Sequence, residues 1–357
     1  MATRPNDTSP AQTARALVRP EIARIEGYVP GEQPRGDGFI KLNTNENPYP
    51  PSERVRKAIV EACDRLVLYP DPTAREVREI AARLYDLDAD GVVVGNGSDE
   101  LLSILVRAVV GPGEGVAYPV PTYSLYDTLV ALHDARSVRV PFPTDFSLPE
   151  ELERADARLF FICNPNAPSG TVVPIERIDA LALARPDAVI VVDEAYADFA
   201  DRNALALVRR RPNVVVLRTL SKAYSLAGLR VGLALASAEL AYELHKVRDS
   251  YNVSRLAQAG ALAALEDQAA MRRHAERVRT TRARLTKELE RLGFQVLPSQ
   301  ANFILARRPG EDLSGVAGAL RERKILVRHF REVPDSLRIT VGTDAEIDAL
   351  LAGLRDS

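Results

Sequence analysis

The sequence of 357 residues has few cysteines, no excess of positive charge and no long apolar run. Its two cysteines, Cys63 and Cys163, give no basis for a disulfide framework, and Cys163 ends an apolar run that is typical of a buried strand. This pattern favours a reducing compartment, so we predict a cytoplasmic protein. The formal net charge of −2 provides no basic excess for binding a nucleic-acid backbone.

No stretch approaches the ~18 consecutive apolar residues that a membrane span needs. Residues 1–27 lack the apolar core of a secretory signal, and we predict that they form a mobile tail. The composition that is present, 46% hydrophobic and 27% charged residues, is typical of a globular protein. The length allows one large α/β domain and a smaller second domain.

Three apolar, β-branched runs in the middle of the chain predict buried strands that end in polar residues. Residues 158–170 run into an Asn/Pro/Gly turn, residues 188–197 into Asp193 and Tyr196, and residues 213–220 into Ser221 and Lys222. Helical stretches at 175–184 and 204–210 separate them, which predicts a parallel sheet. Because ligands bind outside the carboxyl ends of such strands, these polar groups are expected to share one crevice.

Lys222 is chemically unusual because it directly follows a buried strand. An isolated lysine at a strand end is more often a surface residue, but burial would lower its pKa, as a Schiff-base lysine requires. Pyridoxal phosphate needs such a lysine for its aldehyde, an acid for its ring nitrogen and polar donors for its ring hydroxyl. Lys222, Asp193 and Tyr196 could supply these groups.

A phosphate site is predicted where a strand at 92–94 meets the loop Gly95–Ser98 and a helix begins, with Asp99 in its first turn. Unpaired backbone N–H groups at a helix start favour an anion. The loop is neither a Walker loop nor a complete GxGxxG, so a single phosphate fits better than a nucleotide. An ordinary capped strand–helix turn is the alternative.

The segments on either side of the three central strands are predicted to be mostly helical, and the last 65 residues are predicted to form a second, smaller domain. Ser52 is the expected N-cap of a helix over 52–65, and Thr73 with Glu76 is expected to form a capping box for the next helix. Residues 237–292 are expected to be largely helical, interrupted near 249–258. Residues 293–357 predict strands, a helix, two more strands and a final helix.

From about Tyr28 to the C-terminus, the chain resembles the fold-type-I pyridoxal-phosphate-dependent aminotransferases, and within them the histidinol-phosphate aminotransferase family. The segments that carry the resemblance are FIKLNTNENPYPP (39–51), GNGSDE (95–100), AVIVVDEAYA (188–197) and RTLSKAYSLAGLR (218–230). The resemblance implies an α/β fold with a large cofactor-binding domain (51–260), whose mostly parallel sheet is flanked by helices. It also implies a smaller α+β domain (261–357), to which an arm at 28–50 contributes.

The resemblance further implies an activity and partners. The expected reaction is transfer of the amino group of L-histidinol phosphate to 2-oxoglutarate, giving imidazole acetol phosphate and L-glutamate in histidine biosynthesis. An aromatic amino-acid aminotransferase and a phosphothreonine-type decarboxylase of the same fold are the alternatives. An effector domain of a transcription regulator would need a DNA-binding domain, for which the residues before Tyr28 are too few. A homodimer without nucleic-acid or membrane partners is expected.

Each matching residue then takes an expected role. Lys222 binds the aldehyde of pyridoxal 5'-phosphate and moves the proton, Asp193 pairs with the ring nitrogen, and Tyr196 donates to the ring oxygen. The remaining cofactor contacts are Tyr123 over the ring and, at the phosphate, Ser98, Asp99, Ser221, Arg230 and Tyr69 from the partner subunit. The substrate contacts are Tyr28, Asn43, Arg328 and Arg338. Without the resemblance, Tyr123 would be a core aromatic and the two arginines members of structural ion pairs. No metal ligands are expected.

The turn at 164–170 departs from the family. The usual turn is NPNNPTG, whose second Asn bonds the ring oxygen of the cofactor, whereas this chain has Ala167 in that place. Alanine cannot make that hydrogen bond. We therefore hypothesise that Asn166 replaces it through a shifted turn.

Overall fold

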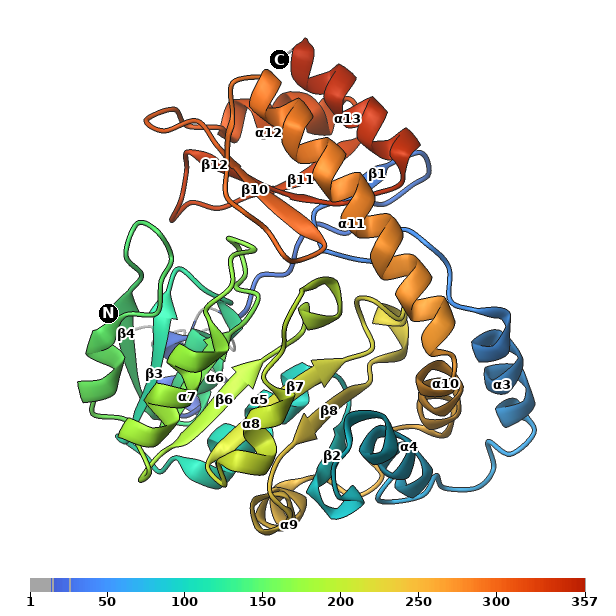
Figure 1. Cartoon of the computed structure of the whole chain (residues 1–357), viewed down its shortest axis with the longest axis vertical. Coiled ribbons are helices and arrows are strands. Elements are labelled where there is room, and N and C mark those ends of the chain that lie inside the picture. Colours follow the sequence, from blue (N-terminus) through green and yellow to red (C-terminus); the bar gives the residue numbers. More distant parts are fainter. Residues whose placement is uncertain (1–13, 15, 26, 357) are drawn as a thin grey trace, which may run out of the picture.

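The computed structural model describes residues 14, 16–25 and 27–356. It contains two sheets, one above the other in the view of Figure 1. The larger sheet has seven strands in the order β2-β8-β7-β6-β5-β3-β4, and the smaller has five in the order β1-β11-β12-β10-β9. This two-part α/β architecture confirms the predicted fold class.

The seven-stranded sheet is mostly parallel, as the sequence predicted. Its strands are β2 (Val92–Gly95), β3 (Gly115–Val120), β4 (Arg136–Pro141), β5 (Leu159–Cys163), β6 (Val189–Asp193), β7 (Val214–Thr219) and β8 (Gly232–Leu235). β4, β3, β5, β6 and β7 pair in parallel, while β8 runs antiparallel to both β7 and β2. The central strands β5 and β7 are buried along their whole length, which explains their unbroken apolar sequence.

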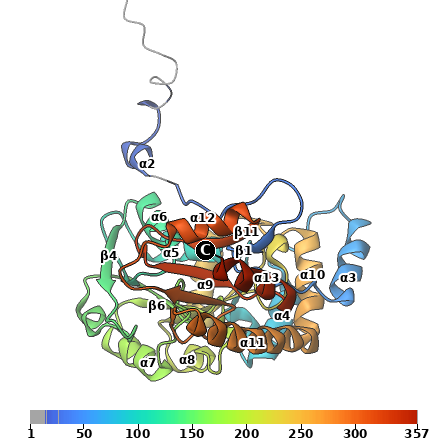
Figure 2. The same cartoon turned by 90° about the horizontal axis from the view of Figure 1, so that it is seen from above.

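Helices cover both faces of this sheet (Figure 2). α5 (Ser98–Val109) and α6 (Leu125–Leu132) lie on one face, and α7 (Ile175–Ala184) and α8 (Leu205–Arg210) lie on the other. A third group, α3 (Glu53–Cys63), α4 (Arg75–Tyr85) and α10 (Arg255–Glu266), packs together beside β2. α9 (Ala238–Val247) contacts β2 and α5.

The five-stranded sheet joins the two ends of the chain. β1 (Ile40–Leu42) pairs in parallel with β11 (Ile325–His329), so the N-terminal segment becomes the edge of a C-terminal sheet. The other strands are β9 (Gln295–Val296), β10 (Phe303–Arg307) and β12 (Ser336–Thr340), and the helices are α12 (Ser314–Glu322) and α13 (Asp344–Arg355). Thr343 and Glu346 form a capping box at the start of α13.

Helix α11 (Gln268–Arg291) crosses from one part of the fold to the other (Figure 1). Its first half places Ala275 and Val278 in the core of the seven-stranded part, and its second half places Leu285 and Leu289 in the core of the five-stranded part. A single 24-residue helix therefore belongs to both cores. The predicted boundary between 260 and 261 stays a prediction.

The predicted capping box of α4 is wrong. α4 begins at Arg75, after Ala74 in a left-handed conformation (φ 49°), and no side chain caps it. The Thr73 hydroxyl instead donates to Asp71 Oδ1 (2.9 Å), which also accepts from the backbone N–H of Thr73 (2.8 Å) and Arg75 (3.3 Å). The capping box does not form because Ala74, and not Thr73, is the N-cap, so the Thr73 hydroxyl lies one position before the place that the box requires. Ser52 does occupy the N-cap position of α3, but without a capping hydrogen bond.

At the N-terminus, Pro20–Arg24 form the short helix α2. Most of the predicted tail 1–27, namely residues 1–13, 15 and 26, lies outside the described residues. Among the residues described, no helix combines the length and apolar character that crossing a membrane requires.

Candidate active site

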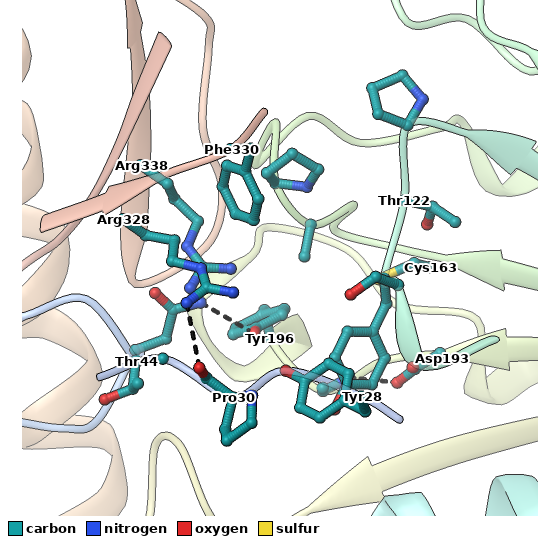
Figure 3. Close-up of a pocket in the computed structure, with 18 of the residues that line it drawn as sticks. Tyr28, Pro30, Thr44, Thr122, Cys163, Asp193, Tyr196, Arg328, Phe330 and Arg338 are labelled. Atoms are coloured by element: carbon teal, nitrogen blue, oxygen red, sulfur yellow. Dashed lines mark hydrogen bonds between the residues drawn. The ribbon is translucent and has the colours of Figure 1, made fainter. Parts of the chain in front are cut away.

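A cavity of about 280 Å³ opens where four neighbouring parallel strands end. The last residues of β3, β5, β6 and β7 all line it: Val120, Cys163, Asp193 and Thr219. The five-stranded part closes the other side with Arg328 and Arg338, and Tyr196 lies between the two sides (Figure 3). All predicted site residues except Asn166 and Tyr69 line this one cavity.

Lys222 directly follows β7 and is held from the N-terminal segment. Asn47 Nδ2 donates to the backbone carbonyls of Lys222 (3.1 Å) and Ala223 (3.2 Å), while Lys222 Nζ donates to the Thr44 carbonyl (3.4 Å). Burial and the nearby Arg338 guanidinium lower the pKa of Lys222 from 10.5 to about 8, against an opposing effect of Glu46. A substantial neutral fraction near pH 7 to 8 makes this amine a nucleophile and a proton carrier.

Asp193 is the buried acid of the cavity. Its Oδ2 accepts from the Tyr126 hydroxyl (2.8 Å) and its Oδ1 from the Ala195 backbone N–H (3.2 Å). Burial raises the pKa of Asp193 to about 6, although the Tyr126 hydrogen bond lowers it. Within the described chain no lysine or arginine forms an ion pair with it, so this carboxylate suits a cationic nitrogen on a ligand.

The residues predicted for the phosphate site come together at the start of α5. Arg230 Nη2 donates to Asp99 Oδ2 (2.9 Å) and its Nη1 to Ser221 Oγ (3.2 Å), so residues from two loops converge beside the N-terminus of α5. Gly97 has φ +85°, and a Cβ there would lie 2.5 Å from Arg230 Nη2. Only glycine therefore lets the guanidinium approach this close to the loop.

Arg328 and Arg338 stand directly opposite each other in the antiparallel pair of β11 and β12. Among the described residues neither forms an ion pair with a carboxylate. Arg338 Nη2 donates to the Asn43 carbonyl (2.9 Å), and Arg328 donates to the carbonyls of Val29 (3.1 Å) and Pro30 (3.3 Å). Buried Arg338 Nε has no hydrogen-bond partner. Two like charges facing one another around an unpaired donor make a site for an anion.

These groups fit pyridoxal phosphate. The buried amine, the acid without a cationic partner and the cradle beside Gly97 match the aldehyde, ring nitrogen and phosphate of that cofactor. When bound, it would supply the aldehyde for an incoming amine and a ring that accepts an electron pair.

Residues 37–354 match the family model for aminotransferases of class I and II. The chain belongs to this aminotransferase family. A curated histidinol-phosphate aminotransferase from Syntrophotalea carbinolica is 48% identical over 343 residues, which is 95% of this chain and 99% of the relative. One from Synechocystis sp. is 46% identical, covering 94% of this chain and 97% of the relative.

The solved structure of histidinol-phosphate aminotransferase from Sinorhizobium meliloti, in complex with pyridoxal-5'-phosphate, has the same fold. It superposes with a TM-score of 0.81 at 32% identity and covers 88% of this chain and 91% of its own. Together with the family match, it confirms the prediction of a fold-type-I aminotransferase that uses pyridoxal phosphate.

In this aminotransferase, Asn166 does not line the cavity. Its Nδ2 donates to the Pro121 carbonyl (3.1 Å) and to Ser169 Oγ (2.9 Å), and its Oδ1 accepts from the Thr122 hydroxyl (2.8 Å). Both amide hydrogens therefore have acceptors within the protein. The hypothesis that Asn166 replaces the missing family Asn is not supported by this arrangement, because one of these bonds would have to break.

Tyr69 lies outside the cavity as well. Its side chain is 78% exposed and its ring stacks on that of Tyr251, with 4.6 Å between centroids. A contribution of Tyr69 to the phosphate site of a partner subunit stays a prediction.

Tyr123 lies at the cavity wall, as predicted. Its hydroxyl donates to Asp99 Oδ1 (3.2 Å), and its ring meets that of Tyr28 edge-on at 6.0 Å. A ring between the phosphate cradle and the N-terminal arm is placed to contact a planar ligand.

The sequence reading did not single out several residues of the site. Tyr126 lies in the first turn of α6, and its hydroxyl donates to Asp193. Asn45 belongs to the 39–51 segment that carries the resemblance, and its Nδ2 lies 3.0 Å from the Tyr196 hydroxyl oxygen. Phe330 lines the cavity from a loop whose course the sequence did not indicate.

Proposed function

We propose that this aminotransferase transfers the amino group of L-histidinol phosphate to 2-oxoglutarate, yielding imidazole acetol phosphate and L-glutamate. Two of its relatives carry the name of this activity and match over nearly their full length. The observation that carries the proposal is the Arg328–Arg338 pair on the cavity wall opposite Asp193 (Figure 3).

The two arginines suit both substrates. The amine donor ends in a phosphate and the amine acceptor in a carboxylate, so one cationic site must receive an anion in each half of the reaction. Burial and the neighbouring Arg328 lower the pKa of Arg338 from its ordinary value, which means that its charge lacks compensation. A bound anion provides that compensation, and guanidinium geometry suits phosphate and carboxylate alike.

We assign the proton transfer to Lys222. With its pKa near 8, Nζ can take the proton from the substrate carbon that bears the amino group. It can then return the proton to the carbon that receives the amino group. Asp193 holds a positive charge at the ring nitrogen, and Arg230 with Ser221 anchors the phosphate end. These roles rest on where the side chains lie in the cavity.

We also propose a cytoplasmic homodimer in which Tyr69 reaches the partner's cavity. An exposed apolar surface supports it, formed by Val60, Leu66, Val67, Leu68 and Tyr69. Large apolar side chains this exposed and this close in sequence, with Val67 at 91% exposure, are typical of a protein–protein contact.

A coupled assay tests the proposed reaction. The purified protein, given pyridoxal phosphate, L-histidinol phosphate and 2-oxoglutarate, should form one glutamate for each histidinol phosphate consumed. Lys222→Ala should abolish turnover. Glutamate formation from phenylalanine but not from histidinol phosphate would place the chain with the aromatic enzymes, and carbon dioxide release from phosphothreonine would place it with the decarboxylases.

A further inference from the structure

We propose that Asn45 is a positioning residue that directs the hydroxyl hydrogen of Tyr196 into the cavity, and that Thr340 fixes Asn45 in turn. Tyr196 would then act as a dedicated hydrogen-bond donor to the ring oxygen of pyridoxal phosphate. The inference rests on the cofactor part of the proposed function and not on the identity of the substrate.

Asn45 is almost completely buried and has all of its polar groups engaged. Its backbone N–H donates to Thr340 Oγ1 (3.0 Å), and its carbonyl accepts from Asn302 Nδ2 (3.0 Å). Its Nδ2 donates to the Tyr196 hydroxyl oxygen (3.0 Å). The residue has φ +57°, a left-handed conformation that asparagine tolerates better than most residues. The backbone is thus held in an uncommon conformation that aims this amide at Tyr196.

Thr340 binds the Oδ1 end of the Asn45 amide, and the NH₂ end faces Tyr196. The Thr340 hydroxyl oxygen accepts from the Asn45 backbone N–H, so its single hydrogen is free to donate, and Asn45 Oδ1 is the acceptor at 3.1 Å. With Oδ1 taken up by Thr340, the NH₂ end of the amide points to Tyr196.

The hydrogen bond from Asn45 leaves the hydroxyl hydrogen of Tyr196 free to donate to another group. A phenol has one hydrogen to donate, and its oxygen can accept. Because the oxygen accepts from Asn45, its own hydrogen must point elsewhere. In the described chain Asn45 is the hydrogen-bond partner of this hydroxyl, and Tyr196 lines the cavity, so the hydrogen remains available to a ligand.

The turn at 164–170 makes this donor more important. Ala167 lines the cavity where the family turn carries an amide, and the amide hydrogens of Asn166 are bound to Pro121 and Ser169. Of the polar donors that the sequence assigned to the ring oxygen, only Tyr196 faces the cavity. A single donor must have a fixed direction to be effective, because a hydroxyl free to turn loses part of its hydrogen bond.

The test measures binding and not turnover. The full-length chain, freed of cofactor, is titrated calorimetrically with pyridoxamine 5'-phosphate and with the 3-deoxy analogue that lacks the ring hydroxyl. The ratio of the two dissociation constants reports the contact to the ring oxygen. We expect wild type to prefer the hydroxyl form by about tenfold or more, typical of a hydrogen bond to a charged oxygen. Tyr196→Phe should reduce this preference to about twofold or less.

Two substitutions then address the direction of the hydrogen. Asn45→Asp keeps the shape of the residue and its tolerance of a positive φ, but a carboxylate accepts and cannot donate. The Tyr196 hydrogen would turn toward it and the preference should fall to the level of Tyr196→Phe. Thr340→Val introduces no charge, removes the group that fixes the amide, and should lower the preference in part. Thr281→Val, which removes a buried hydroxyl bound to Asp344 (3.1 Å), is the matched control and should change nothing.

The double variant Asn45→Asp/Tyr196→Phe separates positioning from charge repulsion. If Asn45 acts through Tyr196, the double variant has the same preference as Tyr196→Phe alone. A further loss in the double variant, or an unchanged preference in both Asn45→Asp and Thr340→Val, would overturn the inference. Failure of the proposed function appears separately, because no amine substrate enters these titrations.

Discussion

The hydroxyl of Tyr126 lies 2.8 Å from Oδ2 of Asp193, and both groups are buried. The two residues are 67 positions apart in sequence, and the carboxylate has no cationic partner in the described chain. Burial raises the pKa of Asp193 to about 6, and the phenol partly opposes that rise. Tyr126 therefore helps to keep Asp193 ionised at neutral pH, ready for the cationic ring nitrogen of the cofactor.

Replacing Tyr126 by Phe should weaken cofactor binding. The pKa of Asp193 rises further without this hydrogen bond, and a hydrogen bond to a charged group contributes about 1.5–3 kcal/mol. We expect the dissociation constant of pyridoxamine 5'-phosphate at pH 7 to increase about tenfold or more, and less at pH 9. Tyr118→Phe is the matched control, since its hydroxyl bonds Asp127 (2.6 Å) and not Asp193. Equal affinity in wild type and Tyr126→Phe would contradict this role.

Asp193→Asn should stabilise the cofactor-free protein while destroying its function. The folded pKa of about 6 lies above the ordinary 3.8, so folded Asp193 keeps its proton to a higher pH than the unfolded chain does. The folded state thus loses stability as pH rises from about 4 to 6, by roughly 3 kcal/mol at most. In urea unfolding, the variant should equal wild type near pH 4 and exceed it above pH 6. If the free energies of unfolding of wild type and variant differed by the same amount at every pH, ionisation of Asp193 would not destabilise the folded state.

Arg338→Ala should impair substrate binding in both half-reactions. Loss of a charge-assisted contact of about 1.5–3 kcal/mol predicts a rise of about 10- to 100-fold in KM for histidinol phosphate and for 2-oxoglutarate. Arg323→Ala removes an exposed arginine that pairs with Asp356 (2.8 Å) and should leave both KM values nearly unchanged. A rise for one substrate alone would mean that the two anions use different sites.

Val67→Asp should separate the proposed dimer. A charge among the exposed apolar side chains of 66–69 disfavours their burial against a second copy. We expect sedimentation at the mass of one chain, 39.1 kDa, together with weaker cofactor binding, because Tyr69 would no longer reach a partner. Leu183→Asp, on the exposed side of α7 at 57% exposure, should leave the mass unchanged. A wild-type protein that already sediments as a monomer would refute the dimer.

The central part of the fold could be predicted from the sequence because its strands are buried on both faces. β5, β6 and β7 appeared as apolar runs, and α7 has the bounds 175–184 that the pattern indicated. β4 and β8 were missed. β4 is an edge strand with exposed Arg136 and Ser137, so its sequence carries no apolar run. β8 is a short Gly-Leu-Ala-Leu segment that begins two residues after Arg230.

The site was predictable where a motif places a residue at the end of a strand. Asp193, Tyr196 and Lys222 share the cavity because neighbouring parallel strands end together. Asn45 and Tyr126 act on these residues over 151 and 67 positions of sequence, and only the tertiary fold brings such partners together. The α4 cap was missed for a different, local reason: the left-handed Ala74 is the N-cap, so the helix begins one residue later than the Thr73–Glu76 pattern indicated.

A single-turnover experiment tests the central claim most directly. The cofactor-loaded protein is mixed, without 2-oxoglutarate, with L-histidinol phosphate or with L-phenylalanine, and the absorbance of the Lys222-bound cofactor is followed. The account predicts rapid loss of this absorbance with histidinol phosphate and a much slower loss with phenylalanine. The former presents a phosphate with up to two negative charges to Arg328 and Arg338, whereas phenylalanine has a single carboxylate charge attached directly to the carbon that bears the amine. Equal rates, or a response to phenylalanine alone, would contradict it.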